Sequence, residues 1–159
     1  MGSKQSKRQT FIGVQQQDFS LEAEYQALCL NNQQDGAVVT FIGLVRDFNQ
    51  GTQVKSLFLE HYSGMTEKCL ESIVEKARGK WQLGRVRVIH RIGQLELAEQ
   101  IVFVGVSATH RKSAFAACEF IMDYLKTQAP FWKKELSSSG DTWLETRQSD
   151  QDAATKWGA

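Results

Sequence analysis

Apolar and polar residues alternate with a period of two in several short runs of the chain, which is the pattern of β-strands. The runs at 37–45 and 101–106 are apolar on both faces, so they predict strands that are covered on both sides. The first two strands and the last two are each expected to pair as an antiparallel hairpin across a polar turn. The predicted strands are residues 37–45, 54–62, 85–92, 101–106, 131–136 and 142–146.

Two longer segments repeat apolar residues every three or four positions, and these segments predict helices. Pro130 ends the second helix, because proline lacks a backbone N–H and disfavours helix at the residue before it. Ser20 can cap a shorter helix near the N-terminus, where residues 11–17 are expected to form a loose arm or an edge strand. The apolar faces consist of Leu70, Ile73, Val74, Ala77 and Trp81 in the first long helix and Ala114, Cys118, Ile121 and Leu125 in the second.

The order of these elements predicts an α+β fold. We expect a layered sandwich, with two helices on one face of a mostly antiparallel sheet and a small antiparallel subdomain formed by the last hairpin. Residues 93–99 are expected to be a turn-rich link. The length of 159 residues suits a single domain, predicted here for residues 11–150. It follows a disordered tail at 1–10 and precedes a polar tail at 151–159, in which Trp157 is able to dock.

Composition and charge narrow the classes of function. The formal net charge is +1, so a broadly basic surface for nucleic acid is not expected. The three cysteines lie far apart without a CxxC pair, which indicates neither a disulfide framework nor a zinc site. No apolar run has the length of a membrane span, and the basic N-terminus lacks the apolar core of a signal peptide. We therefore expect a cytoplasmic protein without metal, cofactor or membrane partner. Acylation at Gly2 stays open, because Gly2 and Ser6 match the loose myristoylation pattern.

Cationic residues and a histidine accumulate where the predicted strands end and the helices begin or end. If their side chains converge, they form a pocket suited to a phosphorylated or carboxylated small molecule. For each residue taken singly, a solvated position on the surface is the alternative. The residues concerned are Arg46, His110, Arg111, Lys126, Lys133 and Arg147.

Lysine is the residue type best suited to catalysis in this sequence. His61 and His90 lie within predicted strands and are expected to be packed or half-exposed rather than ligands. The common hydrolase, metal and nucleotide motifs do not occur, and a cysteine nucleophile is unsupported but not excluded. A lysine with a pKa of about 10.4 is a poor base at neutral pH. Neighbouring cations lower that pKa and allow proton transfer or nucleophilic attack.

Several segments are similar to the family of large, catalytic subunits of molybdopterin synthase, the MoaE family. The resemblance runs from about Phe11 to Trp157. The His-Arg pair and the stretch KTQAPFWK are its distinctive parts, and Ser63 departs from it, because the family usually has proline there. The similar segments are DGAVVTFIGLVRDFNQG, LEHYSGMTEK, LGRVRVIHRIGQL, IVFVGVSATHRKSAFAACEFIMDYLKTQAPFWKKE and GDTWLE.

The resemblance implies an α/β hammerhead fold with an extra antiparallel subdomain. It also implies a reaction, the conversion of cyclic pyranopterin monophosphate (precursor Z) to molybdopterin by insertion of two sulfurs as a dithiolene. The sulfur would come from the thiocarboxylated Gly-Gly C-terminus of a small ubiquitin-like subunit. The large subunit would form a homodimer within a heterotetramer.

The resemblance also implies roles for individual residues. Lys126 and Lys133 match the two lysines of the family's active site, and the division of roles between them is open. His110 and Arg111 match a substrate-binding pair that is contributed across the dimer interface. The other implied substrate-binding residues are Leu44, Val45, Arg46, Lys134, Glu135 and Arg147.

Two other functions are compatible with the residues alone. The chain could be a non-catalytic docking module for a ubiquitin-like tail, with the lysines capturing only a carboxylate. It could also be a small domain that binds RNA through its cationic corner. The second is less favoured, because the sequence offers no aromatic ladder beside a basic stripe.

Overall fold

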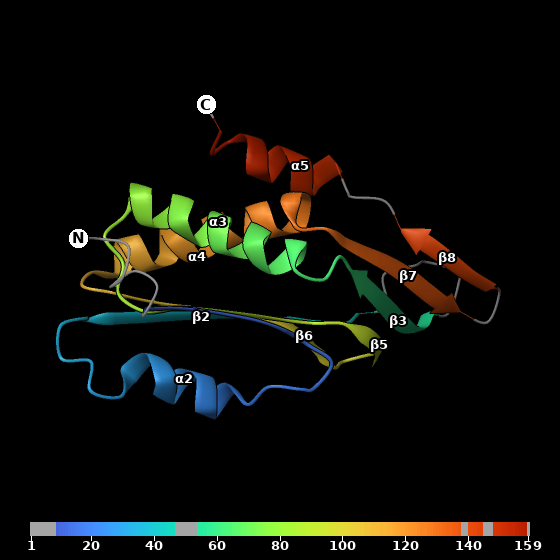
Figure 1. Ribbon diagram of the computed structural model, residues 1–159, viewed down its shortest axis with the longest axis horizontal. Helices are drawn as coiled ribbons and strands as arrows, with labels where there is room; N and C mark the ends of the chain where they lie inside the picture. Colours follow the sequence, from blue (N-terminus) through green and yellow to red (C-terminus); the bar gives the residue numbers. More distant parts are fainter. Residues whose placement is uncertain (1–8, 47–53, 138–139, 145–147, 159) are drawn as a thin grey trace.

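The computed structural model describes residues 9–46, 54–137, 140–144 and 148–158. The described chain forms two four-stranded sheets, and helices cover the first sheet on both faces (Figure 1). In chain order the elements are β1 (Thr10–Gln15), α2 (Leu21–Cys29), β2 (Ala37–Leu44), β3 (Val54–His61), α3 (Met65–Lys80), β4 (Val86–Arg91), β5 (Gly93–Glu96), β6 (Gln100–Ala108), α4 (Arg111–Gln128), β7 (Phe131–Ser137), β8 (Gly140–Leu144) and α5 (Gln148–Thr155).

The first sheet, sheet A, has the strand order β1-β4-β6-β2 and forms the centre of the molecule. The strand β1 pairs with β4 in parallel, while the other two pairings are antiparallel. In β4, Val86 and Val88 face the main core, and Ile89 packs into a second, smaller core with Phe103. The long helices α3 and α4 lie on one face of the sheet and α2 lies on the other (Figure 1).

These layers confirm the predicted α+β fold class, including the two long helices on one face of a mostly antiparallel sheet. The helix α2 on the opposite face explains the pattern in β6, which is buried from Ile101 to Ala108. A strand covered on both sides gains from apolar residues at every position. No described helix is long and apolar enough to cross a membrane.

The second sheet, sheet B, has the order β5-β3-β7-β8, and all its pairings are antiparallel. The pairing of β7 with β8 confirms the predicted last hairpin. The expectation of a turn-rich link at 93–99 was wrong for its first part, because Gly93–Glu96 forms β5. Gly93 has φ 84°, a backbone conformation that favours glycine, and it begins β5 of sheet B two residues after the end of β4 in sheet A.

The predicted hairpin between the first two strands was also wrong. The strand β2 pairs with β6 in sheet A, while β3 pairs with β5 and β7 in sheet B. The alternation of apolar and polar residues predicts which segments are strands, but it does not predict which strands pair with each other. The expected covering of both faces of residues 37–45 was wrong as well, because β2 ends sheet A in the described part of the chain and its residues are half-buried or exposed. The strand β2 contacts mainly β6 and α4, whereas β3 contacts β5 and β7.

The described chain has a strand near its start and a helix near its end. The N-terminal arm forms the edge strand β1, as one of the two expectations for it stated. Residues 148–155 form α5, so the expected polar tail is helical up to Thr155. The docking of Trp157 is confirmed: its ring lies 5.8 Å from that of Trp81, and its Nε1 donates to Asp123 Oδ2 at 2.6 Å. The limits of the domain stay a prediction.

Candidate functional site

A cavity of about 380 Å³ lies at the end of sheet A, where the last turn of α4 meets β7 and the start of α5. Its wall combines apolar side chains, such as Phe41, Met122 and Leu144, with polar and charged groups. Its charged and titratable residues are Arg46, His90, Lys126, Lys133 and Asp150. A pocket that combines apolar side chains with several convergent cations suits a small anionic ligand.

The corner at Pro130 delivers the two lysines from different elements, as predicted. The helix α4 ends at Gln128, and Ala129 has extended dihedral angles (φ −70°, ψ 133°), as expected for a residue before proline. The Phe131 N–H then donates to the Ala129 carbonyl at 2.8 Å and begins β7. Lys126 therefore lies in the last helical turn, and Lys133 lies on a strand.

The end of β2 supplies the opposite wall of the cavity. Leu44, Val45 and Arg46 all line it, together with the two lysines. The backbone of Val45 is held by the chain after β5: its N–H donates to the Glu99 carbonyl at 2.9 Å, and its carbonyl accepts from the Ala98 N–H at 2.7 Å. Leu44 is 55% exposed and Val45 only 4%, so this short segment changes from a solvent-facing to a core position just before Arg46.

Two predicted residues near the end of the chain, Lys134 and Glu135, do not line this cavity. Lys134 points to the other face of β7, where its Nζ lies 3.7 Å from Asp141 Oδ2 and 5.5 Å from the ring centre of Trp143. Glu135 is on the same face as Lys133 but is buried, at 3% exposure. Arg147 lies outside the described residues.

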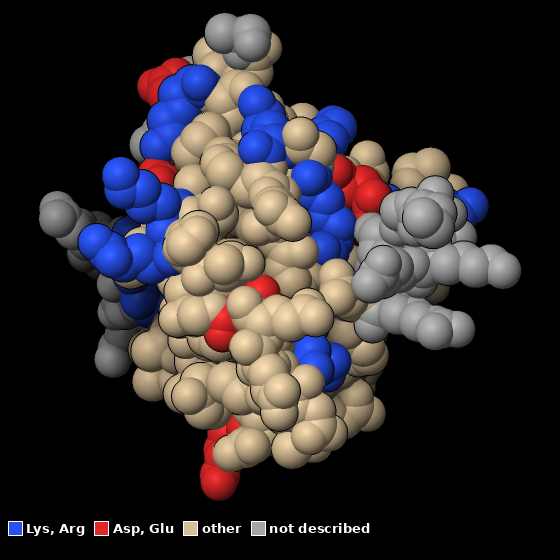
Figure 2. All heavy atoms as spheres, turned by 90° about the vertical axis from the view of Figure 1, so that its left-hand side faces the viewer, with Lys and Arg blue, Asp and Glu red and all other residues tan. Residues whose placement is uncertain are grey.

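His110 and Arg111 are not near the lysines of their own chain. They begin α4 and line a separate hollow with Thr109 and Lys112. Lys126 is 15 residues further along the same helix, which corresponds to about 22 Å at 1.5 Å per residue. Figure 2 views the end of the molecule where α4 begins, and its Lys and Arg side chains are spread mainly over the upper half. One chain alone therefore does not bring all the predicted residues together.

Comparison with known proteins identifies the family. The model of the family described as "MoaE protein" matches residues 14–128. The chain is 58% identical over 146 residues to the molybdopterin synthase catalytic subunit of Vibrio cholerae, covering 92% of this chain and 97% of the relative. It is 58% identical over 149 residues to that of Escherichia coli, covering 94% and 99%. The chain belongs to the MoaE protein family. The molybdopterin biosynthesis MoaE protein from Burkholderia ambifaria has the same fold, with a TM-score of 0.81, 47% identity and coverage of 94% and 99%.

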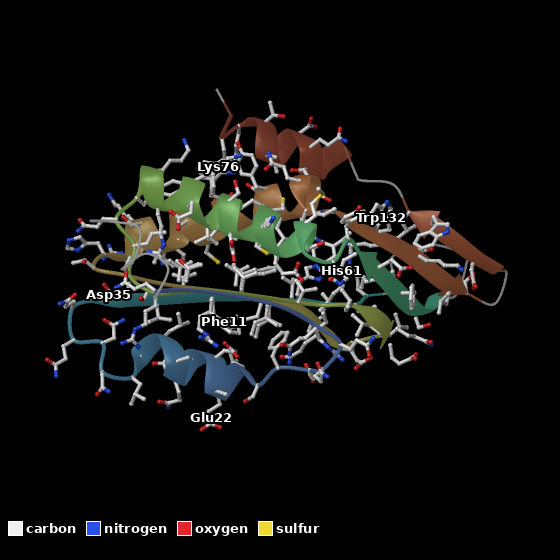
Figure 3. The ribbon with its side chains drawn as sticks, viewed as in Figure 1. Phe11, Glu22, Asp35, His61, Lys76 and Trp132 are labelled. Atoms are coloured by element: carbon white, nitrogen blue, oxygen red, sulfur yellow. The ribbon has the colours of Figure 1, made fainter. Side chains whose placement is uncertain are left out.

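In this MoaE protein, His90 is a cavity residue that sequence reasoning missed. It was expected to be packed or half-exposed, and it is packed, at 3% exposure. Its ring stacks on Phe131, with 3.9 Å between ring centres and 20° between planes. Figure 3 shows the neighbouring His61 where sheet B meets the helices. The available signal was the alternation with Val86 and Val88, which places His90 on the inner face at the end of its strand.

The surroundings of His90 keep its imidazole neutral. Burial lowers the pKa of His90 from 6.5 to about 3, and the positive charges of Lys133 and Lys126 act in the same direction. The Arg91 carbonyl opposes this effect by accepting a hydrogen bond from the ring, with 2.8 Å between Nδ1 and the oxygen. Because the oxygen can only accept, Nδ1 carries the hydrogen and Nε2 carries the lone pair.

The neutral His90 predicts a loss of stability in acid. The unfolded chain protonates His90 below pH 6.5, whereas the folded chain does not until about pH 3, so the unfolded state binds more protons between these values. The contribution is fully present above pH 6.5 and is lost at about 1 kcal/mol per pH unit as the pH falls. Urea unfolding at pH 7 and pH 5 should show a smaller pH effect in His90→Gln, by roughly 2 kcal/mol. An equal pH effect in both proteins would contradict this account.

Two of the cysteines of this MoaE protein, Cys69 and Cys118, offer little nucleophilic chemistry. Burial raises the pKa of the Cys118 thiol to about 12 and also raises the pKa of Cys69. Both are therefore thiols at neutral pH, and the thiolate is the reactive form. Among the described residues, no group of three or more His, Cys, Asp or Glu side chains is arranged to hold a metal ion.

Proposed function

We propose that the chain is the catalytic subunit of molybdopterin synthase. It would transfer sulfur from the thiocarboxylated C-terminus of a small ubiquitin-like subunit to cyclic pyranopterin monophosphate, forming the dithiolene of molybdopterin. The observation that carries this proposal is the cavity that joins Lys126, Lys133 and Arg46 in a member of the MoaE family. The relatives that are 58% identical bear the name of this subunit.

The cavity has the charges that this reaction needs. Both the phosphate of the pterin and the thiocarboxylate are anions, and each is stabilised by ammonium and guanidinium groups. We assign Lys126 to assist the attack of the thiocarboxylate and the proton transfer, while Lys133 and Arg46 hold the phosphate and the developing negative charges. The sulfur comes from the partner, which fits thiols at Cys69 and Cys118 that are poorly ionised.

A homodimer within a heterotetramer is part of the proposal. In the part of the chain that the structure describes, β2 is the last strand of sheet A and exposes Phe41 and Leu44, at 40% and 55%. Such an edge is suited to pairing with a second copy. His110 and Arg111 lie too far from the cavity of their own chain, so we infer that they act in the cavity of the other copy. Lys134, Glu135 and Arg147 stay proposed substrate-binding residues, and the cytoplasmic location stays a prediction.

The alternative is a non-catalytic docking module for the ubiquitin-like tail. In that case Lys126 and Lys133 would capture only a carboxylate, and the pterin would not be converted. The presence of a third cation, Arg46, and of about 380 Å³ of space favours a site that also holds a small phosphorylated molecule.

Reconstitution tests the proposal directly. The purified chain is mixed with precursor Z and the thiocarboxylated small subunit, and molybdopterin is assayed over time. We expect product only with the thiocarboxylated partner, because the same partner with an ordinary carboxylate has no sulfur to give. Binding of both partners without any molybdopterin would overturn the enzyme assignment in favour of the docking module.

A further inference from the structure

The imidazole ring of His90 is fixed by two specific contacts in addition to its burial. Its ring lies on Phe131, and its Nδ1–H is donated to the Arg91 carbonyl. Two contacts of different kinds thus set the plane of the ring and the identity of the protonated nitrogen. The ring is at the cavity wall, with Lys126 and Lys133 lining the same space.

The strand β7 brings Lys133 to the cavity wall at which this ring lies. Phe131 and Lys133 are alternate residues of one strand, so their side chains share a face about 7 Å apart. Since the Phe131 ring is stacked on His90 and Lys133 lines the same cavity, Lys133 is placed to approach the imidazole from β7. Lys126 approaches from the helix instead. The charged or titratable groups that act on the ring are Lys133 of β7, Lys126 of α4 and His61 of β3, and Arg46 and Asp150 line the same cavity. The guanidinium group of Arg91 lies beside Asp18 and Glu99 instead.

We propose that His90 is a positioning residue of the site, whose neutral imidazole offers Nε2 as a hydrogen-bond acceptor to the Lys133 ammonium group. An ammonium group has three hydrogens. With one of them on Nε2, the ammonium group is held at the cavity wall, within reach of the oxygens of the anionic ligand. A protonated imidazole would repel both lysines and would have no acceptor, so the buried and neutral state is a requirement of this role. This inference rests on the proposed function for its catalytic consequence, but not for its tautomer.

The tautomer is tested without partner or substrate. Long-range ¹H–¹⁵N spectra of the full-length ¹⁵N-labelled chain distinguish the two neutral forms of each of the three histidines, and His90→Gln assigns the relevant signals. We expect His90 to be neutral with its hydrogen on Nδ1 from pH 5 to pH 8. A hydrogen on Nε2, or a charged ring at pH 6, would overturn the proposal whatever the enzyme's activity is.

The role of His90 in the reaction is tested with three substitutions, two of which replace the imidazole with side-chain amides of different length. The His90→Gln amide reaches the place of Nε2, whereas that of His90→Asn reaches only Nδ1, and His90→Phe keeps the stacking but has no polar atom. In the reconstituted assay, we expect Asn and Phe to lower kcat roughly tenfold to a hundredfold, because the ammonium group is misplaced. Gln should recover most of the rate, and KM for the small subunit should stay within about twofold in all three.

The pH profile separates positioning from a purely structural role. A hydrogen bond from the ammonium group to Nε2 favours the charged lysine, so its loss should move the limb of the profile that reports Lys133 to lower pH, by roughly one unit. This shift is expected in His90→Asn and His90→Phe and not in His90→Gln. The control is His61→Phe, which changes another histidine near the Phe131 ring outside the cavity lining.

The outcomes for the two proposals are distinct. A wild-type chain that makes no molybdopterin removes the proposed function and leaves the tautomer test standing. An active wild-type chain with equal losses in Gln, Asn and Phe, or with an unshifted pH profile in Asn and Phe, overturns the role of His90. Thermal unfolding of each variant identifies any that is not folded at the assay temperature, and the tautomer spectra of the wild-type chain then decide the proposal.

Discussion

Replacing Lys126 with alanine is expected to reduce molybdopterin formation by roughly a thousandfold while leaving the small subunit bound. The side chain is exposed at the mouth of the cavity and contributes a positive charge beside Lys133 and Arg46. Its removal leaves the anionic groups of the reaction less stabilised and deprives the site of a group for proton transfer. The measurement is the rate of product formation in the reconstituted assay, with binding of the small subunit followed by calorimetry.

A matched control comes from α3. Lys68 is another exposed helical lysine that does not line the cavity, so Lys68→Ala should react at nearly the wild-type rate. Lys126→Arg separates the two roles of Lys126, because arginine keeps the charge but does not give up its proton. Near-normal activity of Lys126→Ala would show that the catalytic assignment is wrong.

Replacing Gly84 with alanine is expected to lower the free energy of unfolding by roughly 3 kcal/mol. An added Cβ would overlap Asp35 Oδ2 and come within 2.6 Å of Ser107 Oγ. These two atoms share a hydrogen bond of 2.7 Å, and Ser107 is fully buried and also accepts from the Arg85 N–H. Figure 3 shows Asp35 at the end of sheet A opposite to His61. Because a buried polar group without its partner is costly, the small residue is needed there.

Urea unfolding followed by tryptophan fluorescence measures this effect. Gly79→Ala is the control, because its added Cβ has no atom within 4 Å and the position is inside α3. Alanine is the better helix former, so this change should raise the free energy of unfolding by up to about 1 kcal/mol. A Gly84→Ala protein as stable as the wild type would mean that the Asp35–Ser107 contact is not part of the stable fold.

Local patterns were sufficient for the long helices, for most of the strands and for the lysine corner, but not for β5 or α5. The helical repeat predicted α3 and α4, and the missing N–H of Pro130 placed the end of α4 two residues before it. Because this corner is a local feature, Lys126 and Lys133 were placed on a helix end and a strand from sequence alone. The alternation in β4 also put His90 on the same side as Val88, although its role in the cavity was not recognised.

The same local patterns did not predict which strands pair when the strands lie far apart in the sequence. The strands β2 and β3 were expected to pair with each other, yet they lie in different sheets. The residues of β5 carry the composition of a turn and form a strand only because β3 offers them an edge. The distance between Arg111 and Lys126 was likewise set by the straight helix between them, which separates residues that a list of cations places together.

The amino-acid sequence by itself therefore determined the long helices, most of the strands, the family resemblance and the two-lysine corner at Pro130. Helix and strand periods and the proline stop act within a few residues, so they can be recognised locally. Tertiary structure alone decided which cations share a cavity and that His90 is buried beside them. Those facts depend on the packing of sheet A, α4 and sheet B against one another. The pKa of His90 is one example. It is lowered to about 3 by burial and by charged residues of other strands and helices, and these neighbours are far from His90 in the sequence.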